Sequence, residues 1–167
     1  MARAALAELG LDKILWIPTG APGYRNAPVA SGEDRVAMLK LALEGEPRYE
    51  IDERELGGGG TGYTYDTLTE VKLECGPGAE LWLLMGADQY AKFEHWHRPD
   101  DIRKLARIGV FARPGWQAGD TRVRTVPFQP MNVSASEIRA RAARGEDFSH
   151  LVPPGVANYM AENGLYR

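Results

Sequence analysis

The residue types best suited to chemistry gather at the start of a predicted helix near the C-terminal end of the chain. Ser134 is followed by Glu137 at the spacing of a capping box, in which each side chain bonds the backbone of the other residue. The first turn of a helix carries unpaired backbone N–H groups and partial positive charge, and both attract anions. Ser136 adds a hydroxyl group, and Arg139 adds a guanidinium fork one turn later. The segment therefore predicts a phosphate site, although an ordinary capped surface helix would use the same residues.

A second candidate site follows the most apolar stretch of the sequence. Residues 81–85 read Leu-Trp-Leu-Leu-Met, the pattern of a strand buried on both faces, and they lead directly into Gly86-Ala87-Asp88. Ligands of open parallel sheets bind beyond the carboxyl ends of the strands, so this turn is a natural binding site. The local pattern also gives Asp88 a second interpretation, as the N-cap of the next helix.

Alternating strands and helices would position both candidates. Apolar runs predict strands at 14–17, 49–52, 81–85, 108–112 and 123–126. Capping residues and periodic apolar positions predict helices at 4–9, 33–44, 64–74, 99–106 and 154–163, with further helices beginning near 89 and 135. Ser31 and Thr64 are predicted N-caps, and Gly10 and Gly164 are predicted to end helices. The alternation predicts an α/β fold with a doubly wound parallel sheet.

Composition limits the classes of protein that fit. The 167 residues suffice for one domain with a substantial core, and the net charge of −3 implies no general affinity for nucleic acid or an anionic membrane. Cys75 is the sole cysteine, which excludes an internal disulfide and fits a reducing cytosol. The longest strongly apolar run, 81–87, is too short to cross a bilayer, and the N-terminal residues lack the pattern of a secretion signal. We therefore expect a cytoplasmic location.

Two further patterns resemble known sites but lack essential parts. His95 and His97 stand two residues apart and make a poor zinc site by ligand count, so we expect no metal held by the protein alone. The glycines at 57–60 are followed by Thr61-Gly62-Tyr63 and lack the Gly-Lys-Ser/Thr ending of a P-loop.

Six short segments, in this order along residues 6–167, carry a family resemblance. They are 10–18 (GLDKILWIP), 51–56 (IDEREL) with 63–68 (YTYDTL), 86–88 (GAD), Trp96-His97, 133–139 (VSASEIR) and 151–167. Each segment is weak alone, but together they resemble the bacterial nicotinate-nucleotide adenylyltransferases, whose Ser/Thr-x-x-Ile-Arg motif corresponds to 133–139. The resemblance implies a Rossmann-like fold of the nucleotidyltransferase type in one domain, residues 1–167.

Two departures from the family pattern accompany this resemblance. The family begins with a strand and a Gly-Thr-Phe-Asp-Pro-x-His-x-Gly-His motif that holds the ATP phosphates, and neither precedes the segment at 10–18. The resemblance places that first strand between those at 14–17 and 81–85, so we expect an N-terminally incomplete domain and low activity of the chain as given. Where the family often has Pro-Pro-His-Lys/Arg, this chain has Pro22-Gly23-Tyr24-Arg25, which retains Arg25 as a weaker phosphate candidate.

The activity implied by the resemblance is adenylyl transfer from ATP to nicotinate mononucleotide. The products would be deamido-NAD (nicotinate adenine dinucleotide) and pyrophosphate, within NAD biosynthesis, and Mg²⁺ would accompany ATP. Two alternatives stay open: an adenylyltransferase for nicotinamide mononucleotide or phosphopantetheine, and a non-catalytic nucleotide-binding remnant. The expected partners are the small-molecule substrates, with no nucleic acid and no membrane, and homo-oligomerisation is left open.

The resemblance also implies a role for each candidate residue. Arg139 would be the catalytic cation, stabilising the charge that develops on the departing pyrophosphate. Trp96 would offer a flat face to the pyridine ring, and backbone N–H groups near Thr64 and His97 would hold the ring's carboxylate. Asp88 would accept hydrogen bonds from a ribose hydroxyl. The expected ATP and phosphate contacts are Ser134, Ser136, Arg139, Arg25, Gly86, Asp88 and Arg113.

Overall fold

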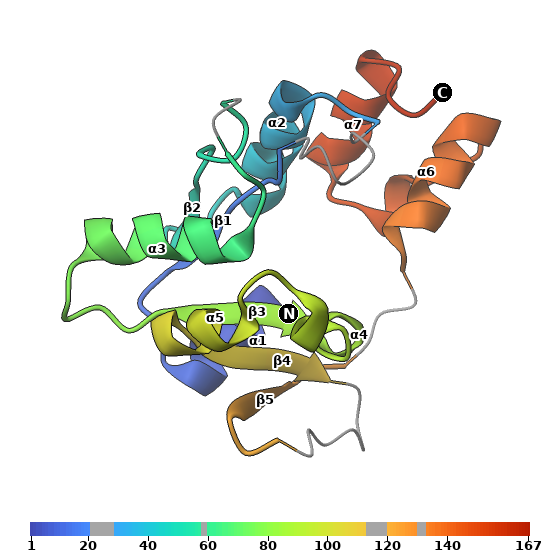
Figure 1. Ribbon diagram of the computed structural model, residues 1–167. Helices are drawn as coiled ribbons and strands as arrows, with labels where there is room; N and C mark the ends of the chain where they lie inside the picture. Colours follow the sequence, from blue (N-terminus) through green and yellow to red (C-terminus); the bar gives the residue numbers. More distant parts are fainter. Residues whose placement is uncertain (21–28, 58–59, 113–119, 130–132) are drawn as a thin grey trace. The chain divides into compact units, whose positions relative to one another are not determined.

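The described residues form two compact units, each built from two stretches of the chain (Figure 1). The computed structural model describes residues 1–20, 29–57, 60–112, 120–129 and 133–167. The first unit comprises Met1–Ile14 and Gly60–Pro130, and the second comprises Leu15–Gly59 and Met131–Arg167. We describe each unit by itself, and the single domain over residues 1–167 stays a prediction.

A parallel sheet of three strands is the centre of the first unit. Its order is β3 (Trp82–Gly86), β4 (Arg107–Ala112) and β5 (Val123–Pro127), and both neighbouring pairs run parallel. The central strand β4 is buried at every residue after Arg107, as expected for a parallel strand covered on both faces. The helical elements of this unit are α1 (Ala2–Leu9), α3 (Thr64–Cys75), α4 (Ala87–Tyr90), η1 (Phe93–His95) and α5 (Pro99–Leu105).

Helices cover both faces of this sheet. On one face, Ile108 of β4 packs in the main core with Ile102 of α5 and Leu68 of α3. The next residue, Gly109, points to the opposite face because side chains alternate along a strand. A Cβ atom at Gly109 would stand 3.1 Å from the side chain of Leu9, so α1 packs closely against this second face. The arrangement is the doubly wound one that alternating strands and helices predict.

The second unit contains a two-stranded sheet and a set of packed helices. The strands are β1 (Ile14–Trp16), which begins at the boundary between the units, and β2 (Tyr49–Ile51). Tyr159 of α7 (Pro154–Glu162) donates a hydrogen bond of 3.0 Å to Asp34 of α2 (Gly32–Leu43), and Gly155 lets α7 approach Leu41. The remaining elements are α6 (Ala135–Arg144) and η2 (Ser149–Leu151).

The predicted α/β class and the predicted strands are confirmed. All five predicted strands are present within one or two residues of their expected bounds. They form two sheets, β1-β2 and β3-β4-β5, and no strand of the described residues pairs with both β1 and β3, the position at which the family resemblance places a further strand. An apolar run identifies a strand, whereas its pairing depends on the neighbours that tertiary structure supplies.

Several predicted helix ends are confirmed and one is wrong. Gly10 ends α1 in the left-handed region at φ 63°, and Ser31 caps α2 by accepting a hydrogen bond from the Asp34 N–H group at 3.0 Å. Thr64 is not the N-cap of α3, because that position belongs to Tyr63 and its side chain makes no capping bond. The helix predicted from residue 89 is the short α4 followed by η1. Among the described helices, none has the length and apolar character needed to span a bilayer.

A carboxylate fixes α4 to the turn before β5, and its contribution to stability should depend on pH. Hydrogen bonds from Arg122 and from the Tyr90 hydroxyl, the latter 2.6 Å long, lower the pKa of Asp120 from its ordinary value of 3.8. A carboxylate whose pKa is lower in the folded state stabilises the protein fully at pH values above its unfolded-state pKa. This stabilisation is lost as the pH falls through the folded-state pKa. We expect Asp120→Asn to reduce the free energy of unfolding by about 1 kcal/mol at pH 7 and by less at pH 2.5.

Denaturant titrations of the parent and variant at both pH values test this expectation. The exposed Asp12 provides the control, since Asp12→Asn should change neither titration. An equal loss for Asp120→Asn at pH 7 and pH 2.5 would contradict the assignment of the stabilisation to the ionised carboxylate.

Candidate functional site

The predicted site residues are divided between the two units. Thr64, Gly86, Asp88, Trp96 and His97 belong to the first unit. Ser134, Ser136 and Arg139 belong to the second unit. Arg25 and Arg113 lie outside the described residues. The geometry of each group is therefore given within its own unit.

The start of α6 confirms half of the predicted capping box. Ser134 is the N-cap residue, and its Oγ accepts a hydrogen bond of 3.1 Å from the Glu137 N–H group. The Glu137 carboxylate accepts a hydrogen bond of 2.8 Å from Arg141 Nε, one turn further along the helix. The cap is local, so the sequence spacing was enough to find it. The Glu137 carboxylate is engaged with the body of the helix.

Arg139 differs from the other arginines of α6 in its charge partners. Arg141 and Arg144 form ion pairs with glutamates at 2.8 and 2.6 Å. Arg139 is exposed, and one of its Nη atoms donates to Ser136 Oγ at 3.4 Å. Over the described ranges it has no carboxylate partner. The positive charge of Arg139 and the hydroxyl of Ser136 are thus grouped in the first turns of α6 and are free to meet an anion.

The carboxyl end of β3 has open space next to its last residue, Gly86. Gly86 ends β3 and is the N-cap of α4, and a Cβ atom built on it would meet no atom within 4 Å. Asp88 is therefore not the N-cap, contrary to one of its two predicted interpretations. It is exposed in the first turn of α4, and in the part of the chain that the structure describes its carboxylate has no hydrogen-bond partner. An open backbone turn beside an unengaged carboxylate suits the hydroxyl groups of a nucleotide.

Trp96 is held in a fixed orientation by the core of the first unit. Its ring lies 5.4 Å from the buried ring of Phe93 at an interplanar angle of 53°, and the backbone N–H group of Trp96 donates to the Phe93 carbonyl at 3.0 Å. The residue is only half-buried, so part of the indole surface remains accessible. A ring anchored on one side and exposed on the other can stack with a planar ligand.

Two ring contacts bring the beginnings of α3 and α5 together. The Tyr63 ring lies 4.3 Å from the His97 ring at an interplanar angle of 30°. The Arg98 guanidinium lies 3.8 Å from the centre of the Tyr65 ring. Thr64, which lies between the two tyrosines, is thereby placed near His97. Across the described ranges, neither the Thr64 nor the His97 backbone N–H group donates a hydrogen bond, so both are available to an acceptor.

Sequence reasoning gave no role to Tyr65 or Arg98, and it used Tyr63 only as part of the turn with Thr64. The available signal was a pair of tyrosines flanking Thr64 and an arginine directly after His97. Their contacts join residues more than thirty positions apart in the sequence. Only the packing of α3 against α5 could show which aromatic ring meets which partner.

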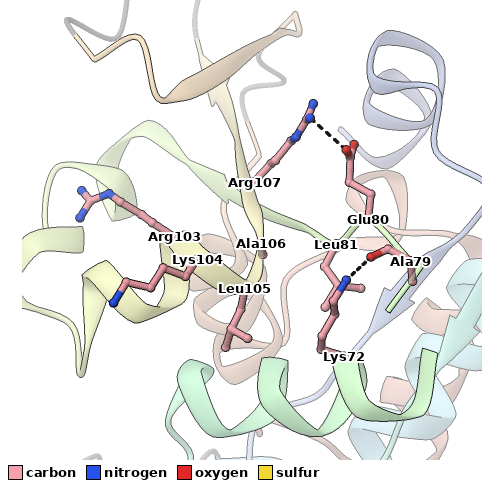
Figure 2. A pocket seen from close by; sticks show the side chains of 10 residues that line it. Lys72, Ala79, Glu80, Leu81, Arg103, Lys104, Leu105, Ala106 and Arg107 are labelled. Atoms are coloured by element: carbon pink, nitrogen blue, oxygen red, sulfur yellow. Dashed lines mark hydrogen bonds and ion pairs between the residues drawn. The ribbon is translucent and has the colours of Figure 1, made fainter. Parts of the chain in front are cut away.

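A pocket in the first unit lies at the opposite end of the strands (Figure 2). It has a cavity volume of about 290 Å³ and is lined by the end of α3, residues 78–81, the end of α5 and the start of β4. Arg107 pairs with Glu80 at 3.1 Å, and Lys72 Nζ donates to the Ala79 carbonyl group, so these cations are already partnered. Ligands of such sheets bind at the carboxyl ends of the strands, and this pocket lies at the amino ends. We do not assign it to a nucleotide.

Comparison with known proteins identifies the family. The family model for cytidylyltransferase-like proteins matches residues 1–141. A relative from Laribacter hongkongensis, named as a nicotinate-nucleotide adenylyltransferase, is 40% identical over 190 aligned residues that cover 100% of this chain and 86% of the relative. A relative from Bordetella petrii with the same name is 40% identical over 179 aligned residues, which cover 100% of this chain and 90% of the relative. The chain belongs to the family of the nicotinate-nucleotide adenylyltransferases.

Solved structures show the same fold as the family assignment implies. A nicotinic acid mononucleotide adenylyltransferase of Plasmodium falciparum complexed with NaAD superposes with a TM-score of 0.72 at 14% identity, covering 93% of this chain and 83% of that one. The same enzyme complexed with APC gives a TM-score of 0.67. The predicted Rossmann-like fold of the nucleotidyltransferase type is therefore confirmed. Membership of the family, shown by the relatives and the family model, makes the chain a nucleotidyltransferase.

Proposed function

We propose that this chain transfers the adenylyl group of ATP to nicotinate mononucleotide, giving deamido-NAD and pyrophosphate in NAD biosynthesis. The observation that carries the proposal is the 40% identity, over the whole chain, to relatives named as nicotinate-nucleotide adenylyltransferases. The available N–H groups of Thr64 and His97 beside the half-exposed Trp96 support a planar ring that bears a carboxylate. A cytoplasmic location and homo-oligomerisation stay predictions.

The reaction needs no nucleophile from the protein. A phosphate oxygen of nicotinate mononucleotide attacks the α-phosphorus of ATP and forms a new P–O bond. The bond from that phosphorus to the oxygen bridging to the β-phosphate breaks, and the oxygen leaves with the electron pair as part of pyrophosphate. Catalysis then consists of aligning the two phosphates and stabilising the negative charge on the leaving group.

In this proposal the start of α6 receives the phosphates of ATP. Arg139 donates two N–H groups to phosphate oxygens, a geometry that the planar guanidinium provides and an ammonium group does not. Ser134 and Ser136 add a cap and a hydroxyl at the positive end of the helix. Arg25 is a further predicted phosphate contact, and Arg113 is a predicted ATP contact on the adenine side.

The first unit receives the pyridine nucleotide and the ribose. Trp96 stacks on the pyridine ring, and the Thr64 and His97 N–H groups bind the carboxylate of that ring. Gly86 lets the nucleotide approach the end of β3, and Asp88 accepts hydrogen bonds from ribose hydroxyl groups. The Thr64 and His97 N–H groups and the Asp88 carboxylate have no hydrogen-bond partner among the described residues, so they are available for these roles.

A divalent metal ion serves this class of reaction by neutralising phosphate oxygens. Among the described residues, no group of three histidine, cysteine or acidic side chains is placed to hold a metal. We infer that the ion is Mg²⁺ and that it is bound mainly by the triphosphate, since Mg²⁺ commonly uses one or two carboxylates together with substrate phosphates.

Incubating the full chain with ATP, Mg²⁺ and nicotinate mononucleotide tests the proposal. We expect pyrophosphate and deamido-NAD in equal amounts, at the low rate predicted for the chain as given, separated and quantified by chromatography. Parallel reactions with nicotinamide mononucleotide and with phosphopantetheine identify the acceptor, and a faster reaction with either would contradict the proposed one. ATP binding without product from any acceptor would instead indicate a non-catalytic nucleotide-binding protein.

A further inference from the structure

Arg98 has an unusual backbone conformation at the beginning of α5. Its φ of 57° and ψ of 54° lie in the left-handed region, and in the described part of the chain only Tyr166 shares a positive φ among residues other than glycine. A side chain at such a position is strained, and the strain persists where surrounding contacts hold the residue in place. The contacts of Arg98 therefore indicate what its conformation serves.

The backbone carbonyl group and the side chain of Arg98 both make contacts that hold the residue in place. Its carbonyl oxygen accepts hydrogen bonds from the N–H groups of Asp101 and Ile102, at 3.1 and 3.0 Å, and so begins α5. Its guanidinium stacks on the Tyr65 ring at 3.8 Å and donates to Asp101 Oδ2 at 2.9 Å. The side chain thus joins the first turn of α3 to the first turn of α5.

His97 lies directly before this joint. The Tyr63–His97 ring contact of 4.3 Å and the Tyr65–Arg98 contact of 3.8 Å place two consecutive residues of one segment against two tyrosines of the other. The residue between those tyrosines is Thr64. Leu68 of α3 and Ile102 of α5 already pack in one core, and the two ring contacts further restrain the Thr64 N–H group relative to the His97 N–H group.

We propose that Arg98 is a positioning residue that makes the pyridine-nucleotide site select an acid over an amide. This inference rests on the proposed binding of the ring carboxylate by the Thr64 and His97 N–H groups. Two fixed donors suit a carboxylate, which accepts at both oxygens, whereas a carboxamide offers one acceptor and an NH₂ group that opposes the second donor. Selection against the amide depends on the donors being unable to move apart.

Arg98→Gly is the variant that isolates the side chain. Glycine adopts the left-handed conformation without strain, so the backbone can be retained while the stacking and the ion pair are removed. Arg107→Ala is the matched control, because Arg107 also pairs with a carboxylate, that of Glu80, and lies 5.6 Å from the ring of Trp82, but at the amino end of the strands. It has no role in the proposed site.

Calorimetric titration of the full chain with nicotinate mononucleotide and with nicotinamide mononucleotide tests the inference. We expect Arg98→Gly to raise Kd for the acid about tenfold and to leave Kd for the amide within about twofold. Arg107→Ala should leave both values unchanged. The ratio of the two Kd values is the informative readout, because partial unfolding of a variant would weaken both ligands equally.

Two results would overturn the inference, and they are distinguishable from failure of the proposed function. An Arg98→Gly variant that keeps the preference of the parent for the acid, or that loses both ligands in equal measure, excludes a role in selection. A parent chain that binds neither nucleotide, or that does not prefer the acid, instead refutes the proposed carboxylate site before any variant is compared.

Discussion

Replacing Arg139 with alanine is expected to lower kcat/KM for ATP by about 100- to 1,000-fold, because the variant loses donors aimed at developing phosphate charge. Arg139 is exposed, and its one recorded hydrogen bond, to Ser136, is long at 3.4 Å, so the fold should change little. Steady-state rates of pyrophosphate release, with Tm measured in parallel, give both quantities. Arg139→Lys should be intermediate, since lysine keeps the charge but lacks the planar fork.

Arg144 supplies the matched control on the same helix. It is exposed and is already paired with Glu146 at 2.6 Å, an ion pair that raises the pKa of the Arg144 guanidinium. Arg144→Ala should therefore leave kcat/KM within about twofold of the parent, as for other surface ion pairs that contribute little. If Arg139→Ala and Arg144→Ala behave alike, the phosphate role of Arg139 is wrong and only the net charge of α6 matters.

The local features of this site were predictable, because each depends on a few consecutive residues. Ser134 caps α6 as its spacing from Glu137 predicts, and the apolar run at 81–85 leads to an open turn at Gly86. A cap or a buried strand is fixed by side chains within one or two turns of each other. The sequence thus contains enough information to locate the separate parts of the candidate site.

The non-local features were not predictable for the opposite reason. The left-handed conformation of Arg98 and its stacking on Tyr65 arise from the contact between α3 and α5, and neither segment alone specifies them. The N-cap of α3 was misplaced because Thr61, not Thr64, provides the local polar contacts, accepting from the Tyr63 N–H group at 3.2 Å. Strand pairing likewise depends on neighbouring strands rather than on strand sequence, and only the family resemblance indicated the position between β1 and β3 where no described strand pairs with both.

Replacing Trp96 with alanine is the second change with a large expected effect. Stacking of a heterocyclic ring on an aromatic side chain contributes about 1–3 kcal/mol, so Kd for nicotinate mononucleotide should rise about 5- to 150-fold, while Kd for ATP stays near the parent value. Trp96→Phe retains a ring against Phe93 and should lose only a few-fold. Separate calorimetric titrations with each substrate measure the two constants.

Loss of packing must be separated from loss of stacking, because Trp96 also packs against the core. Trp82, half-buried at the amino end of β3, is the control: Trp82→Ala removes a ring of the same size where no substrate is expected. Both alanine variants should have a lower Tm, since each truncates a partly buried indole. Only Trp96→Ala should weaken the pyridine nucleotide more than ATP. A uniform loss of both ligands in Trp96→Ala, matched by Trp82→Ala, would assign Trp96 to the core and remove it from the substrate site.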